Sequence, residues 1–138
     1  MRSLFYIILL LCMLSSCSKE TRITNKLEGE WELTTFEITT ADGWSTFPSS
    51  EGKFTVRKGN PLSYSMEISY STNGNNGSIL ASGTNIISDD YEYLACYNTS
   101  GDSLLANYRM LTLTNTDLQL EEYKTNGTKY MLIFRKSN

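Results

Sequence analysis

The side chains able to do chemistry are few in this sequence, and their spacing limits what they can do. No histidine occurs among the 138 residues, which removes histidine-based metal sites, Ser-His-Asp and Cys-His catalysis, and the usual general base at neutral pH. Carboxylates occur as adjacent pairs at Asp89-Asp90 and Glu121-Glu122. Neighbours in a strand point to opposite faces, so neither pair is placed to flank a substrate as acid and base. No glycine-rich phosphate loop is present. We therefore expect a protein that is not an enzyme, with no cofactor and no metal.

The first sixteen residues have the pattern of a cleavable export signal. One charged residue, Arg2, precedes an unbroken apolar run from Leu4 to Leu14. Eleven residues of helix reach about 16 Å, about half the thickness of a hydrocarbon core, so this run is too short to span a membrane. We expect residues 1–16 to be a signal-peptide helix that is removed.

The chemistry at the end of that run centres on Cys17. Leu14-Ser15-Ser16-Cys17 resembles the lipobox of bacterial lipoproteins, in which an aliphatic residue and two small residues precede a cysteine. The resemblance implies lipidation of the Cys17 thiol, a membrane partner and a place in the bacterial cell envelope, with the outer membrane as the expected site. Ser18-Lys19-Glu20 resembles the tag that follows the lipid cysteine in surface-exported lipoproteins of Bacteroidetes. Polar residues would follow any such anchor, so the periplasmic and surface faces both stay open.

Cys96 is the cysteine that remains for the folded domain. Cys12 leaves with the signal, and the Cys17 sulfur is used by the lipid, so no intramolecular disulfide is expected. The surrounding residues, Tyr93 to Tyr97, have the composition of a strand. A lone thiol in an oxidising compartment is safest when buried, so we predict that Cys96 is a small core hydrophobe.

Length and charge define one domain and exclude one class of partner. After residues 17–25, the lipidated cysteine and its tether, residues 26–138 suit a single domain. Without Arg2 the chain keeps 11 basic and 15 acidic residues, and no block of like charge occurs. A nucleic-acid partner is therefore not expected.

Strand signals dominate that domain. Apolar residues alternate with polar ones from Leu62 to Tyr70 without a miss, as a half-buried strand requires. Further strands are expected near 30–40, 44–47, 52–58, 78–87, 91–97, 104–114, 118–124 and 128–136, separated by turn-forming residues. At most one helical turn, near Ile23 to Leu27, is expected before them.

These strands favour a closed barrel. The apolar phase switches within 30–40, from Trp31 and Leu33 to Phe36 and Ile38, which predicts a bulge or bend near Thr34-Thr35. Such bends turn the corners of small barrels. We predict an all-β fold, an up-and-down antiparallel barrel of about eight strands, with a β-sandwich as the alternative.

Both ends of the domain resemble a known family. Leu27 to Leu33, with Gly29-Glu30-Trp31 at its centre, resembles the Gly-x-Trp entry into the first strand of lipocalins and the wider calycin group. The strands at 111–114, 117–120 and 130–135 resemble the last strands of short lipocalin-like lipoproteins of Bacteroidetes. The resemblance implies that Trp31 plugs one end of the barrel, that Arg135 packs across the indole, and that Gly29 lets the backbone pass close to the ring. A guanidinium over an indole is also physically favourable, by about 1 kcal/mol.

The interior of such a barrel is the first candidate binding site. Six side chains would line it: Phe36, Leu62, Tyr64, Met66, Ile68 and Tyr70. The first hypothesis is a non-catalytic binding domain for a small apolar ligand, which a cavity above about 300 Å³ would favour. The second is a filled barrel that docks on, or inhibits, an envelope protein, because the last strand is apolar on both faces. The third is glycan binding by the tyrosines at positions 91, 93, 97 and 108.

One further motif concerns modification. Asp102-Ser103-Leu104 resembles the acceptor motif for protein O-glycosylation in Bacteroidetes, and it follows the turn at Gly101. Ser103 is therefore a candidate O-glycosylation site.

Overall fold

The computed structural model describes residues 19–47, 49–72 and 75–137. The predicted signal peptide (1–16) and Cys17 lie outside the described residues. Within the described part of the chain, no helix is both long and apolar enough to cross a bilayer.

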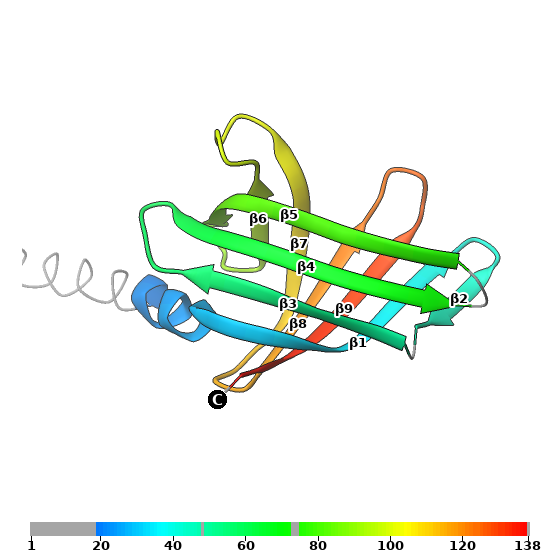
Figure 1. Ribbon diagram of the computed structural model, residues 1–138. Helices are drawn as coiled ribbons and strands as arrows, with labels where there is room; N and C mark the ends of the chain where they lie inside the picture. Colours follow the sequence, from blue (N-terminus) through cyan, green and yellow to red (C-terminus); the bar gives the residue numbers. More distant parts are fainter. Residues whose placement is uncertain (1–18, 48, 73–74, 138) are drawn as a thin grey trace, which may run out of the picture.

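The described residues form an antiparallel barrel (Figure 1). Its strands are β1 (Gly29–Thr40), β2 (Gly43–Thr46), β3 (Ser49–Arg57), β4 (Leu62–Thr72), β5 (Asn75–Ile87), β6 (Tyr93–Tyr97), β7 (Leu104–Leu113), β8 (Asp117–Tyr123) and β9 (Lys129–Lys136). Eight of them follow one another around the wall, and pairing of β1 with β9 closes it. Among the described residues, the ninth, β2, pairs only with Glu37–Thr40 of β1. The predicted eight-stranded up-and-down barrel is confirmed, and the sandwich alternative is wrong.

The predicted bend in β1 is also confirmed. The register between β1 and β9 shifts between Leu33 and Thr35. Trp31, Leu33 and Phe36 are all buried, although Leu33 and Phe36 differ in parity. The bulge lets one strand keep its apolar side chains inside while it changes its pairing partner from β3 to β2.

The interior is densely filled near the start of β1. Trp31, Phe54 and Phe134 are fully buried there, and the rings of Phe54 and Phe134 lie 5.8 Å apart. Leucines from β8 and β9 pack around them: Leu118, Leu120 and Leu132. Burying such side chains is the main favourable term in folding, so this half of the barrel is a solid core.

A helix over residues 19–27 precedes the first strand, where the sequence suggested a loose tether with one turn. Its last residue, Leu27, is fully buried at the end of the barrel. Two carbonyls of the last turn find donors from the barrel: Trp31 Nε1 donates to Leu27 O at 2.8 Å, and Lys136 Nζ donates to Lys26 O at 2.9 Å. Tertiary contacts of this kind satisfy helix-end carbonyls and stabilise a short helix that the local sequence would not.

The helix defines two ends of the barrel. The closed end carries the helix and the β3–β4, β5–β6 and β7–β8 connections, and an ion pair joins Glu28 to Lys58 there (Figure 1). The open end carries the β1–β2, β4–β5, β6–β7 and β8–β9 connections.

The wall has a gap on its open side because β6 is short. Among the described residues, strand β5 pairs with β6 only over residues 84–87, while it pairs with β4 over residues 75–85. Among described residues, β5 residues 75–83 therefore have register partners in β4 alone; we call this segment the free edge. It begins at Gly83, where an added Cβ would lie 2.0 Å from the carbonyl oxygen of Tyr97, the last residue of β6. Figure 1 shows β4 and β5 running on beyond β6.

Candidate functional site

A cavity of about 390 Å³ lies between the free edge and the strands opposite it. One wall comes from β4 and β5, and the other from β6, β7, β8 and β9. The lining residues are Tyr64, Met66, Tyr70, Ser78, Ile79, Leu80, Ala81, Cys96, Leu105, Ala106, Tyr108, Glu122, Lys124 and Tyr130. Its volume is within the range of small-molecule sites. Polar and apolar groups contribute about equally to its surface, so the site offers hydrogen bonds as well as apolar contact.

Two phenols line the cavity, and their hydroxyls are in different environments. The Tyr108 hydroxyl lies 3.6 Å from the sulfur of Met66 and donates a weak hydrogen bond to it. The buried Tyr64 hydroxyl has no hydrogen-bond partner among the described residues. Burial, with a smaller contribution from Cys96, raises the pKa of Tyr64 to about 12, so the phenol stays protonated. A buried hydroxyl costs free energy when it is unpaired, and a ligand atom could pair with it.

An ion pair stands on the opposite wall. Glu122 points inward from β8 with only 7 % of its surface exposed, and its carboxylate lies 2.6 Å from the Lys124 ammonium. That ammonium also lies 5.7 Å from the centre of the Tyr130 ring. The partly exposed Lys124 ammonium therefore neutralises the Glu122 carboxylate, and both side chains line the cavity. A polar group of a ligand could replace part of this contact.

Aromatic rings separate the cavity from the rest of the open end. Phe36 stacks on Tyr130, with ring centres 5.9 Å apart and planes at 6°, and it also contacts Tyr70 at 4.8 Å. Phe47 folds in from the end of β2 and packs against Phe36 and Tyr70. Tyr70 and Tyr130 of this cluster also line the cavity, and the lining extends to the exposed Leu80 on the free edge, so we call it the lateral cavity.

The predicted lining row is partly correct. All six side chains point into the barrel, as alternation requires. Tyr64, Met66 and Tyr70 line the cavity, whereas Phe36, Leu62 and Ile68 are absent from its lining and belong to the packed core. The sequence pattern did not reveal the contributions of β5, β7 and β8. The inward carboxylate at Glu122, in phase with Leu118 and Leu120, was the available signal.

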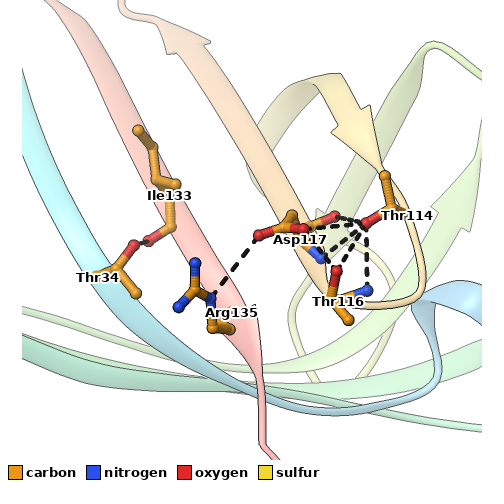
Figure 2. A network of polar contacts seen from close by, with 6 residues as sticks. All are labelled: Thr34, Thr114, Thr116, Asp117, Ile133 and Arg135. Carbon is orange, nitrogen blue, oxygen red and sulfur yellow. Dashed lines mark hydrogen bonds and ion pairs between the residues drawn. The ribbon is translucent and has the colours of Figure 1, made fainter.

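The predicted partner of Trp31 is wrong by one residue. Lys136, not Arg135, places its charge over the indole, 4.9 Å from the ring centre. Trp31 and Lys136 are register partners and share the inward side, whereas Arg135 pairs with Glu32 on the outer face. Figure 2 shows Arg135 directed toward Asp117, with 3.9 Å between Nε and Oδ1. Gly29 makes room for the Lys136 side chain, whose Cε would lie 2.6 Å from an added Cβ.

Cys96 is buried and free, as predicted. Its sulfur accepts a hydrogen bond from Asn85 Nδ2 at 3.0 Å. Burial raises the pKa of the Cys96 thiol to about 12, although the Asn85 hydrogen bond acts in the other direction. The thiol therefore behaves as a neutral part of the cavity wall.

The remaining sequence candidates are dispersed. Of the four tyrosines considered for glycan stacking, Tyr108 is buried inside, Tyr93 and Tyr97 lie on the outer side of β6, and Tyr91 lies under the Lys19 ammonium. Ser103 is exposed in the β6–β7 connection beside Asp102. It remains a candidate for O-glycosylation.

A second hollow, of about 730 Å³, lies over the β3, β4 and β5 strands near the open end. Apart from the Tyr70 ring, short polar residues and Glu51 line it, including Ser69, Ser71 and Ser78. It is more open to solvent than the lateral cavity, which encloses a ligand better and is therefore the better candidate site.

No family model matches this chain, and no curated protein matches it. Among solved structures, a redesigned β-barrel is similar, with a TM-score of 0.47 and 13 % identity over 85 % of this chain and 96 % of the other.

Proposed function

We propose that this protein is an envelope lipoprotein, anchored through Cys17, whose lipocalin-like barrel binds a small apolar ligand in the lateral cavity. The single observation that supports it best is Tyr64, whose side chain lines the cavity of about 390 Å³ and whose buried hydroxyl has no partner among the described residues. A ligand with one hydrogen-bonding group and an otherwise apolar body would satisfy the phenol and bury its own surface.

The same site carries no catalytic set. Glu122 is held by Lys124, and Glu121 points to the outer side, where it pairs with Lys129 at 3.5 Å. Within the described residues no cluster of three or more metal-binding side chains occurs. Binding without chemistry is therefore the activity we propose.

The anchor gives the barrel an orientation. Residue 19 is the first described residue of the helix at the closed end, and it follows Cys17 by two positions, a reach of at most about 7 Å. A lipid on Cys17 would hold the closed end beside the bilayer and direct the open end toward the aqueous phase. A ligand would then reach the cavity from the aqueous side.

Ligand binding can be tested with N-phenyl-1-naphthylamine, an apolar probe that fluoresces when shielded from water. We expect the mature chain with Cys17→Ser to bind it, and Ala106→Phe to lose binding at least tenfold, since this side chain lines the cavity. Ala95→Phe, on the neighbouring strand but absent from the lining, is the matched control. Equal binding by both variants would show that the probe binds elsewhere.

Tyr64→Phe tests the polar contact. The change removes a hydroxyl that has no described partner, so the free energy of unfolding should stay the same or rise. Native mass spectrometry of protein purified from its own host should show a bound small molecule with the natural chain and less with Tyr64→Phe. A host-purified protein free of any small molecule would contradict the proposal.

Lipidation has its own test. The natural chain expressed in a bacterial host should incorporate an alkyne-tagged fatty acid, and Cys17→Ser should not. Label retained in the variant would exclude Cys17 as the anchor.

The second hypothesis, a docking protein, has one supporting observation. Large apolar side chains are exposed on the outer side of β5, β6 and β7: Ile86, Tyr93, Leu104 and Leu111. This outer surface is compatible with a partner, but the cavity exceeds the volume that we set as favouring a ligand.

A further inference from the structure

The free edge offers a backbone that can pair with another strand. The Ser88 amide donates to the Tyr93 carbonyl at 3.0 Å, so Ser88 directs its backbone toward β6. Alternate residues of an antiparallel strand face the same neighbour, and the β4–β5 register runs without a shift through this region. The N–H and C=O groups of Ser78, Leu80 and Ser82 therefore point into the lateral opening, where β6 no longer continues.

The side chains along this edge suit an added strand. Ile79 and Ala81 point inward and line the cavity together with Ala106 and Tyr108 of β7. Leu80 points outward with 81 % of its surface exposed. A strand beside β5 would place alternate side chains in the cavity, next to Ile79 and Ala81, and the others on the outside, next to Leu80.

We propose that the free edge binds an extended peptide segment of a partner protein by strand addition, with the alternate apolar side chains of that segment in the lateral cavity. The inference rests on the proposed function in one respect, that the cavity accepts an apolar group from outside. It goes further because the backbone edge specifies a polypeptide. A chain with donors and acceptors repeating every two residues, about 7 Å, matches the edge groups of Ser78, Leu80 and Ser82.

A single segment fits better than a second copy of this protein. In a second copy, β5 has β4 paired along its other edge. Inserting that β5 between the two walls would bring β4 against β7 and β8. A free segment has no such attachment, so a partner with an exposed extended stretch is the occupant that the opening accommodates.

The probe is a phage-displayed library of random ten-residue peptides, selected on the complete mature chain with Cys17→Ser. We expect the enriched peptides to carry apolar residues at alternate positions. Leu80→Pro deletes one edge N–H but leaves the ladder with β4 intact, because Leu80 directs its backbone away from β4. It should weaken binding of an enriched peptide at least tenfold.

Leu80→Ala is the matched control, because it removes the side chain and keeps the N–H; it should weaken binding less than Leu80→Pro does. A second measurement leaves the protein unchanged. Methylating alternate peptide nitrogens of an enriched peptide should abolish binding in one phase of alternation and spare it in the other.

Four results would overturn this proposal. These are a selection without alternating peptides, equal binding by Leu80→Pro, indifference to the methylation phase, and dimerisation of the natural chain that Leu80→Pro abolishes in analytical ultracentrifugation. The naphthylamine probe separates the two proposals. Probe binding without peptide binding would remove the strand-addition inference alone, while failure of the mature chain with Cys17→Ser and an otherwise natural sequence to bind the probe would contradict the ligand cavity itself.

Discussion

At the scale of residues, the alternation of inward and outward side chains along β9 decides which basic residue makes polar contacts inside the closed end. Lys136 combines two roles, because its ammonium lies over the Trp31 ring and also donates to the Lys26 carbonyl at the helix end. Arg135, one residue earlier, is exposed, and its Nε lies 3.9 Å from Oδ1 of Asp117. Charges that are half-buried and hydrogen-bonded contribute more than exposed ion pairs do.

Lys136→Met should therefore lower the free energy of unfolding by about 2 kcal/mol, because it loses a charged hydrogen bond and a cation–π contact. Arg135→Gln should change it by less than about 0.5 kcal/mol. Urea denaturation followed by Trp fluorescence measures both. Equal losses would mean that the Lys136 contacts contribute nothing specific.

Cys96 predicts how stability depends on alkaline pH. In the unfolded chain the thiol ionises near the ordinary cysteine pKa of 9.0, whereas in the folded chain burial raises this pKa to about 12 and the thiol keeps its proton. Between these values the unfolded state binds fewer protons, so the free energy of unfolding falls as pH rises. We expect denaturation midpoints to decline above pH 9, and Cys96→Ala to decline less over the same range. A Cys96→Ala curve parallel to that of the natural chain would refute this assignment.

At the scale of elements, the length of β6 decides whether there is a site. β6 stops at Tyr97, paired with Thr84, and its chain turns away at the level of Gly83. A longer β6 would have paired with the free edge and closed the wall. β6 thus turns away from β5 beside Gly83. Glycine is required at this position because the Tyr97 carbonyl oxygen occupies the space that a Cβ would take.

Gly83→Ala should consequently destabilise the fold by several kcal/mol, since the new Cβ would meet backbone atoms at 2.0 and 2.5 Å. Gly43→Ala is a fitting comparison. Gly43 also has a positive φ, 131° against 155° at Gly83, but nothing lies within 4 Å of its added Cβ. Thermal unfolding should place Gly83→Ala well below Gly43→Ala; matching midpoints would show that backbone strain alone matters.

At the scale of the whole molecule, the two ends have separate roles. The helix, Trp31 and the packed leucines seal the closed end, while the cavity and free edge lie toward the open end. If the lipid is on Cys17, the sealed end faces the bilayer. Depth measurements can check this arrangement.

Fluorophores on Asn115→Cys, in the β7–β8 turn, and Thr125→Cys, in the β8–β9 turn, would mark the closed and open ends. In vesicles with spin-labelled headgroups, lipidated protein should show strong quenching at position 115 and weak quenching at 125. Cys96 is buried with a raised pKa and should not react with the label. Stronger quenching at 125 would reverse the proposed orientation.

The sequence by itself determined the fold class, the bend in β1 and the buried state of Cys96. It did so because strand alternation and turn residues are local properties, and a change of apolar phase can be read along one strand. The inward row of β4 was predicted for the same reason. These features need no knowledge of which strands lie opposite one another.

Tertiary structure alone decided the rest. Which basic residue covers Trp31 depends on the register between β1 and β9, and a shift of one residue exchanges inner and outer faces. The helix at residues 19–27 is stabilised by hydrogen bonds that Trp31 and Lys136, which lie outside the helix, donate to the carbonyls of its last turn. The cavity exists because β5 outruns β6, and the relation between two strand lengths is set only when the wall is assembled.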